Sequence, residues 1–157
     1  MRVLVACEFS GKVREAFRRK GHDAWSCDVE PAYFDGRHHY QCDVLEVLDR
    51  DWDLMVAHPP CTYLSNAGTI HLHRHNSDKY KSPRGVCGKA RWKELKKAAA
   101  FFRKLLLAPI KYIAIENPVP SGYAIKRMGV KYNQIIEPWQ FGHNNSKRTC
   151  LWLKNLP

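Results

Sequence analysis

The sequence predicts an α/β fold in which helices cover both faces of a mostly parallel sheet. Apolar segments of strand length alternate along the chain with segments of helical periodicity, which is the pattern of such sheets. The 157 residues are enough for one domain, residues 1–157, with a core of its own. Groups of polar residues directly follow several of the apolar segments, and the ligands of open α/β sheets bind at the carboxyl ends of strands.

Each expected element rests on a local pattern. A β-branched apolar run opens the chain, and the helical segment over residues 12–20 stops at Gly21. The longest helix is expected over about residues 91–107, where Trp92 and Phe102 belong to an apolar set at helical spacing. The expected strands cover residues 2–6, 23–27, 53–57, 111–115, 133–137 and 149–153. Residues 66–90 carry Gly, Ser, Pro, Lys and His without a clear period, so we expect one long loop there.

The charge favours a polyanionic partner. Lys and Arg number 26 against 15 Asp and Glu, a formal net charge of +11, and nucleic acid is the partner that fits best. A basic soluble protein without such a partner is the alternative on charge alone. Hydrophobic residues make up 45% and aromatic residues 11% of the chain, which favours a packed globule over a disordered chain.

The sequence shows no sign of export. The first residues run straight into a strand pattern without a signal peptide, and no apolar run reaches the length of a membrane span. We therefore expect a cytoplasmic protein. Its six cysteines have no paired short spacing, and disulfides are not expected in a reducing compartment.

Two short motifs carry chemistry. The run His58-Pro59-Pro60-Cys61 places a thiol on a rigid turn after a strand, because proline constrains its own backbone and the residue before it. Glu116, in Glu-Asn-Pro after a later strand, supplies a carboxyl group at the same edge of the sheet. A thiol that adds to a ring carbon and an acid that protonates the ring would then be neighbours. The alternatives are a buried structural cysteine and a carboxylate that caps a helix.

Together these segments resemble the cytosine carbon-5 DNA methyltransferase family, in order, across nearly the whole chain. The matching segments are Leu4–Gly11, Asp28, Asp43, His58–Ser65, Ile113–Pro118 and Phe141–Thr149. The resemblance implies a Rossmann-like fold that uses S-adenosylmethionine, and a DNA duplex with a flipped cytosine as substrate.

The resemblance also implies roles for single residues. Cys61 would add to carbon 6 of cytosine, Glu116 would protonate ring nitrogen 3, and Asn117 and Arg148 would support the catalytic loop and the flipped base. The residues expected to bind the cofactor are Cys7, Glu8, Phe9, Ser10, Gly11, Asp28, Asp43 and Pro59. The residues expected to contact nucleic acid are Ser65, Arg84, Lys89, Lys147 and Arg148.

The chain departs from the family in two places. The first motif is poor in glycine, with Gly11 alone at the turn where glycine lets a backbone approach the cofactor. The sequence also ends about where the target-recognition domain of the family begins. It therefore resembles a small, phage-like version of the family, and we expect it in the cytoplasm of a bacterial or phage-infected cell. A partner subunit or a homodimer could supply target recognition.

Several alternatives stay open at this point. One is a catalytically silent relative that only binds nucleic acid, and another is a methyltransferase of RNA or free nucleotides. A zinc site on His71, His73, His75 and Cys87 is a further reading, although no Cys-x-x-Cys pair completes four ligands. A solvated basic loop that meets phosphate is preferred there, and we expect no metal.

Overall fold

A computed structural model of the chain describes residues 1–33, 35–73 and 86–157. A seven-stranded sheet in the order β3-β2-β1-β4-β5-β7-β6 forms its centre. Five strands are parallel, and β7 runs antiparallel to its neighbours β5 and β6. The strands are β1 Arg2–Ala6, β2 Asp23–Asp28, β3 His39–Gln41, β4 Leu54–Ala57, β5 Tyr112–Pro118, β6 Gln134–Ile136 and β7 Thr149–Lys154.

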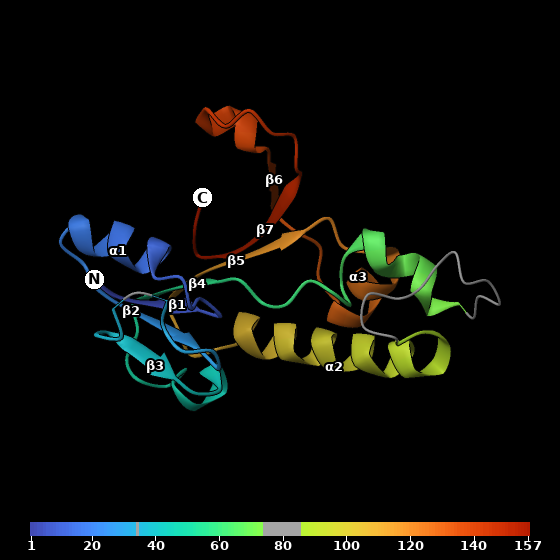
Figure 1. Ribbon diagram of the computed structural model, residues 1–157, viewed down its shortest axis with the longest axis horizontal. Coiled ribbons are helices and arrows are strands. Elements are labelled where there is room, and N and C mark those ends of the chain that lie inside the picture. The colour runs from blue at the N-terminus through green and yellow to red at the C-terminus, as the bar shows by residue number, and fades with distance from the viewer. Residues whose placement is uncertain (34, 74–85) are drawn as a thin grey trace.

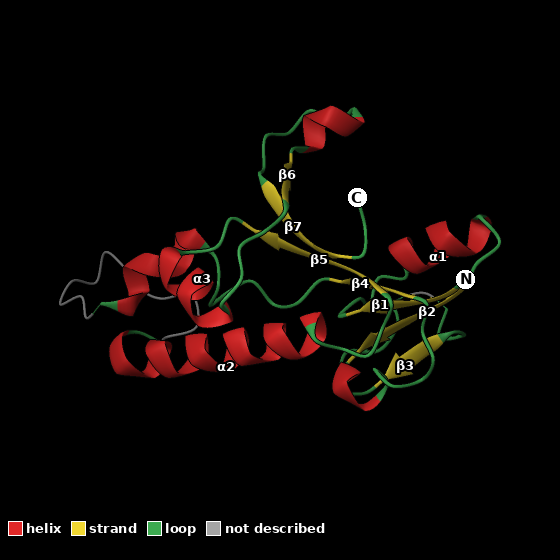
Figure 2. Cartoon of the chain, turned by 180° about the vertical axis from the view of Figure 1, so that it is seen from behind, coloured by secondary structure: helices red, strands yellow, loops and turns green. Residues whose placement is uncertain are grey.

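Helices lie on both sides of this sheet, as Figure 1 shows with α1 above it and α2 below. The α-helices are α1 Lys12–Arg19, α2 Gly88–Leu106 and α3 Gly122–Met128, and three short 3-10 helices are η1 Val44–Glu46, η2 Asn66–Leu72 and η4 Pro138–Phe141. From behind, α2 and α3 are seen side by side on the same side of the sheet (Figure 2). The expected fold class, a mostly parallel sheet with helices on both faces, is confirmed.

The two faces of the sheet are buried to different degrees. On the α2 side, alternate residues such as Met55, Ile115 and Trp152 are fully buried in one cluster with Ala99 and Phe102 of α2. On the α1 side a smaller cluster joins Val3, Val5 and Ala24 to α1, which packs against β1 and β2. The α1-side residues of β4, β5 and β7 are therefore only half-buried, and this open half of the sheet includes Glu116.

Two elements were not foreseen. Strand β3 is short and polar, and it forms because it pairs with β2 and stacks Tyr40 on Trp25 at a ring distance of 4.9 Å. Helix α3 starts where Ser121 Oγ accepts a hydrogen bond from the Ala124 amide at 3.1 Å and ends at Gly129, whose φ is 73°. Both ends are ordinary helix caps that were present in the sequence.

Two expected boundaries need correction. The Glu-Asn-Pro segment is not a turn after a strand, because residues 116–118 still pair with β7 and extend β5. The single loop expected over residues 66–90 is wrong at both ends, since residues 66–72 form η2 and α2 begins at Gly88. Residues 74–85 lie outside the described part of the chain. Among the helices in the described part, none is both long and apolar enough to cross a membrane.

The core predicts a clear stability difference between two phenylalanines. Phe102 is fully buried with its ring 4.8 Å from that of Trp152, whereas Phe141 is 65% exposed. We expect Phe102→Ala to lower the free energy of unfolding by about 3–5 kcal/mol, because it leaves a cavity against β7. Urea unfolding followed by tryptophan fluorescence measures this. The control Phe141→Ala should change it by less than about 0.5 kcal/mol; equal losses would contradict this packing.

Candidate active site

The expected site residues gather at one edge of the sheet. Strands β1, β2, β4 and β5 are parallel, so the residues that end them, among them Cys7, Asp28 and His58, lie at a common edge. Strand β7 is antiparallel and begins at this edge, where Thr149 pairs with Pro118. Arg148, which directly precedes Thr149, is thereby brought to the same edge.

The loop that carries Cys61 is tied to the end of β5 by hydrogen bonds on both of its sides. The buried Asn117 side chain donates from Nδ2 to the carbonyl oxygen of Pro59 at 3.0 Å. Beyond the cysteine, the Ser121 amide donates to the Leu64 carbonyl at 2.8 Å. The Asn66 amide donates to the carbonyl of residue 119 at 2.9 Å. Cys61 is thus held on a segment that cannot move independently of β5.

Inside the loop, the backbone is closed into a tight turn. The amides of Leu64 and Ser65 both donate to the Cys61 carbonyl, at 3.0 and 2.9 Å. The Cys61 side chain itself is half-buried, which leaves the thiol within reach of a ligand. Ser65 stands before η2 and bridges to Pro120, so its backbone supports the loop.

Arg91 connects this turn to α2 and was not singled out from the sequence. Its guanidinium donates to the Thr62 carbonyl at 2.7 Å and lies 5.0 Å over the Tyr63 ring, and the residue is only 2% exposed. Gly68 leaves room for this guanidinium, because a Cβ at that position would collide with it. The first turns of α2 are therefore fixed against the Cys61 loop.

Glu116 has a partner that the sequence did not suggest. Its Oε2 lies 3.3 Å from Nδ1 of His58, and each side chain is about one third exposed, 33% and 31%. Behind the carboxyl group is Cys150, whose thiol pKa is raised by burial and further by the charge of Glu116. The carboxyl group is thus oriented by an imidazole rather than left free in solvent.

The turn after β1 takes a left-handed conformation at a residue that is not glycine. Cys7 adopts φ 59°, in the left-handed region that glycine normally fills. The carboxylate of Glu8 then accepts hydrogen bonds from the Val13 amide at 2.7 Å and the Arg14 amide at 3.3 Å. Ser10 Oγ adds a third at 3.1 Å. A helix N-terminus is a natural anion site, and here the chain's own Glu8, which is 6% exposed, occupies it.

Two cavities open beside this turn, and Cys7 lines both. The first, about 290 Å³, is lined by Cys7, Cys27, Asp28, Val29, Cys42, Asp43, Val44, Pro60 and Phe101. The second, about 310 Å³, is lined by Cys7, Glu8, Phe9, Ser10, Lys12, Val13 and His58. Each is at the lower end of the size range of ligand pockets. Gly11, the left-handed residue that precedes α1, is in the lining of neither cavity.

The first cavity combines apolar walls with carboxylates. Burial, assisted by the charges of Asp28 and Asp43, raises the pKa of the Cys7 thiol to about 12. The thiol that lines this cavity is therefore uncharged at neutral pH. Asp28 and Asp43 each accept one backbone hydrogen bond at 3.0 Å, from the amides of Glu30 and Leu45, through a single oxygen. The second oxygen of each carboxylate accepts none of these bonds. Pro59 is buried, and its neighbour Pro60 lines the cavity in its place.

The expected nucleic-acid contacts are placed in different surroundings. Arg148 is 70% exposed and its Nε lies 3.1 Å from Oε1 of Glu137, while Lys147 beside it is exposed. Lys89 is exposed in the first turn of α2. Arg84 lies outside the described residues, as does His75. Over residues 1–33, 35–73 and 86–157, no three His, Cys, Asp or Glu side chains gather as metal ligands.

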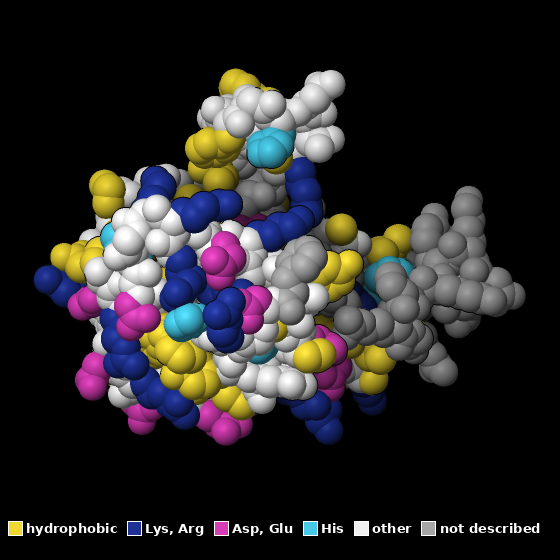
Figure 3. Space-filling model, turned by 60° about the vertical axis from the view of Figure 1, so that its left-hand side comes forward, with side chains coloured by type: hydrophobic (Ala, Val, Ile, Leu, Met, Phe, Trp, Pro, Cys, Tyr) yellow, Lys and Arg dark blue, Asp and Glu magenta, His cyan; other side chains and the backbone are white. Residues whose placement is uncertain are grey.

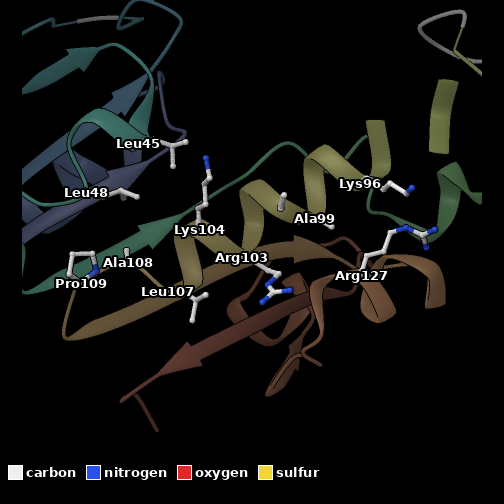
Figure 4. Close-up of a pocket in the computed structure, with 11 residues that line it drawn as sticks. Leu45, Leu48, Lys96, Ala99, Arg103, Lys104, Leu107, Ala108, Pro109 and Arg127 are labelled. Atoms are coloured by element: carbon white, nitrogen blue, oxygen red, sulfur yellow. The ribbon is translucent and has the colours of Figure 1, made fainter. Parts of the chain in front are cut away.

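A larger basic groove runs along the outer side of α2 (Figure 4). This α2 groove encloses about 760 Å³ and is lined by Leu45, Leu48, Lys96, Ala99, Ala100, Arg103, Lys104, Leu107, Ala108, Pro109 and Arg127. Lys96 and Arg127 stand at one end, and Leu45 and Leu48 at the other. Every charged residue in its lining is a cation. Lys96, Arg103 and Lys104 form no ion pair with any carboxylate that the structure describes.

Comparison with known proteins supports the fold. No family model and no curated protein matches the sequence. The structure resembles a methyltransferase of Entamoeba histolytica, EhMeth, with a TM-score of 0.56 and 16% identity over 99% of this chain and 53% of that one. It also resembles a protein described as a DNA modification methyltransferase encoded within a prophage of E. coli, with a TM-score of 0.54 and 13% identity over 96% and 45%.

A third similar structure is the Dnmt2 methyltransferase of S. pombe, with a TM-score of 0.51 and 18% identity over 100% of this chain and 50% of that one. The chain thus spans about half the length of these solved structures. At such identities the likeness concerns the fold alone. Sheet order, parallel strands and these likenesses together show that the chain has the Rossmann-like fold of S-adenosylmethionine-dependent methyltransferases.

Proposed function

We propose that this protein is a DNA cytosine-5 methyltransferase in which Cys61 is the nucleophile and Glu116 the general acid. One observation carries the proposal. The Pro-Pro-Cys loop and the Glu-Asn-Pro end of β5 are hydrogen-bonded to each other at the edge of the sheet where the two cavities open. A thiol and a carboxyl group on two segments held together in this way can act on one ring.

The cavities suit S-adenosylmethionine, which supplies the methyl group when bound. Asp28 and Asp43 would present their second carboxylate oxygens to ribose hydroxyls and to an adenine amino group. The neutral thiol of Cys7 and the ring of Phe101 would border the adenosine. Because the Glu8 carboxylate already fills the start of α1, the amino-acid end of the cofactor would need other partners, and Ser10 and Lys12 line the second cavity.

The reaction follows from the two protein groups. The Cys61 thiolate adds to carbon 6 of the flipped cytosine while the Glu116 carboxyl group gives its proton to ring nitrogen 3. Carbon 5 then becomes nucleophilic enough to take the methyl group. The proton of carbon 5 passes to solvent water and the Cys61 sulfur departs as thiolate, which restores the aromatic ring, while nitrogen 3 returns its proton to Glu116. One turnover therefore releases the carbon-5 proton and regenerates both protein groups.

The charge distribution favours nucleic acid as the substrate. Arg91 fixes the first turns of α2 to the Cys61 loop, and the exposed cations Lys89, Lys93 and Lys96 lead from there into the α2 groove. From Lys89 to Lys104 the helix rises about 22 Å, enough to follow several phosphates of a duplex. The side with α1 differs, because Lys and Arg there are interspersed with Asp and Glu (Figure 3).

A catalytically silent nucleic-acid binder is the second candidate. The observation in its favour is Glu8, whose carboxylate occupies an anion site at the start of α1. Such a protein would bind DNA but form no covalent intermediate. Trapping that intermediate therefore separates the two candidates.

Incubation with DNA that contains 5-fluorocytosine, together with S-adenosylmethionine, should give a covalent protein-DNA adduct at Cys61. The adduct accumulates because fluorine cannot leave carbon 5 as a proton does. Denaturing electrophoresis and mass spectrometry of the linked peptide detect it. Cys61→Ala should abolish the adduct while leaving DNA affinity within about twofold, and Glu116→Gln should slow its formation by about 100-fold or more. An adduct that forms on Cys61→Ala at the parent rate would contradict the proposed nucleophile.

The α2 groove should control the salt dependence of DNA binding. The pair Arg103→Gln and Lys104→Gln removes two cations from it, so the slope of log K against log salt should fall by about 2 in magnitude. Fluorescence anisotropy with a labelled duplex measures the slope. The matched pair Arg19→Gln and Lys20→Gln, at the end of α1, removes the same charge outside the groove and should leave the slope nearly unchanged. Equal effects of the two pairs would show that only net charge matters.

A further inference from the structure

His58 lies between the proposed acid and the second cavity. It directly follows β4, and its Nδ1 is 3.3 Å from Oε2 of Glu116. Its other ring nitrogen, Nε2, is buried and has no hydrogen-bond partner among the residues that the structure describes. The ring also lines the second cavity. One imidazole therefore touches the carboxyl group through Nδ1, while its Nε2 is buried without a described partner.

We propose that His58 is a positioning and proton-donating partner of Glu116, which supplies the proton that the carboxyl group passes to its substrate. This inference rests on the proposed function, because it gives the Glu116 carboxyl group a proton to donate. A carboxyl group ordinarily loses its proton near pH 4, whereas an imidazole keeps one up to near-neutral pH. Of the two groups in such a pair, the imidazole therefore keeps its proton to the higher pH.

The proton moves in a closed path. Nδ1 of the imidazolium gives its proton to the Glu116 carboxylate, and the carboxyl group so formed gives a proton to ring nitrogen 3 of the cytosine. When Cys61 leaves, nitrogen 3 returns a proton to the carboxylate, and the carboxyl group returns one to Nδ1. Both protein groups are regenerated in the cycle.

The groups around this pair are few and come from four elements. Glu116 of β5 faces His58 directly, and Cys150 of β7 stands behind Glu116 with a raised thiol pKa. Across the second cavity are Cys7 and Glu8 after β1 and Lys12 of α1. The Glu8 carboxylate is bound to backbone amides of α1, which leaves Glu116 as the carboxylate in direct contact with the imidazole.

The ring nitrogens of His58 test the pairing in the free protein without reference to activity. Their NMR resonances are compared at one fixed pH between the parent protein and Glu116→Gln. Loss of the carboxylate removes the partner that lies 3.3 Å from Nδ1, so the Nδ1 resonance of His58 should move. His22 packs its ring on Phe17 at the opposite edge of the sheet and is the internal reference, so its resonances should not move. Unchanged His58 resonances would overturn the proposal.

The pH profile of adduct formation on 5-fluorocytosine DNA separates proton supply from simple positioning. Both proteins need the same Cys61 thiolate, so the ratio of their rates isolates the proton donor. His58→Gln keeps a hydrogen-bonding side chain but cannot store a proton, so its rate at pH 7 should be about 10- to 100-fold lower than that of the parent, and this deficit should shrink as the pH is lowered and Glu116 takes its proton from solvent. A variant profile parallel to that of the parent would leave only a structural role and would overturn proton donation.

The two proposals fail differently. If the parent forms no adduct at any pH, the methyltransferase proposal fails, and the NMR comparison alone decides whether His58 and Glu116 are paired. If the adduct forms but neither the His58 resonances nor the rate profile responds, the methyltransferase proposal stands and His58 has no part in it. Circular dichroism of both variants checks that the fold is kept.

Discussion

The hydrogen bond from the Asn117 amide to the Pro59 carbonyl is the constraint on which the site depends. Asn117 is 1% exposed, and it lies on β5 while Pro59 lies 58 residues earlier after β4. A buried amide that satisfies a carbonyl in the interior is costly to remove, because the freed group would lack a partner. Two neighbouring parallel strands can place two loops at one edge, and this contact, together with the bonds from Ser121 to Leu64 and from Asn66 to residue 119, holds one loop against the other.

The turn after β1 is held without glycine in its left-handed position, and the carboxylate of Glu8 beside it is bound rather than free. Cys7 takes the left-handed turn, Glu8 caps α1, and Arg91 binds the Thr62 carbonyl, so three charged or strained groups are used for structure. The carboxyl group of Glu116 differs from that of Glu8, because its partner is an imidazole whose charge can change. This contrast is the physical reason to place the acid chemistry at residue 116.

The sequence was sufficient for six of the seven strands and for the edge at which the polar groups meet, because apolar runs and the residues after them are local signals. It was not sufficient for contacts across the sheet. From the sequence, Arg91 is indistinguishable from a surface cation of a helix, and only the fold places it against the Thr62 carbonyl. In the same way, His58 lies next to Glu116 because β4 pairs with β5. Strand β3 is too short and polar to be visible, whereas the caps of α3, Ser121 and Gly129, were readable signals. The roles expected for the cofactor and nucleic-acid residues stay predictions.

The most direct test of the tie between the two loops is amide hydrogen exchange in Asn117→Leu, which keeps the side-chain volume but removes the donor to Pro59. The account predicts that the amides of Leu64 and Ser65, which close the Cys61 turn, exchange about tenfold faster than in the parent, while amides of β1 are unaffected. Unchanged exchange at residues 64 and 65 would contradict it, because the Cys61 loop would then be held in place without β5.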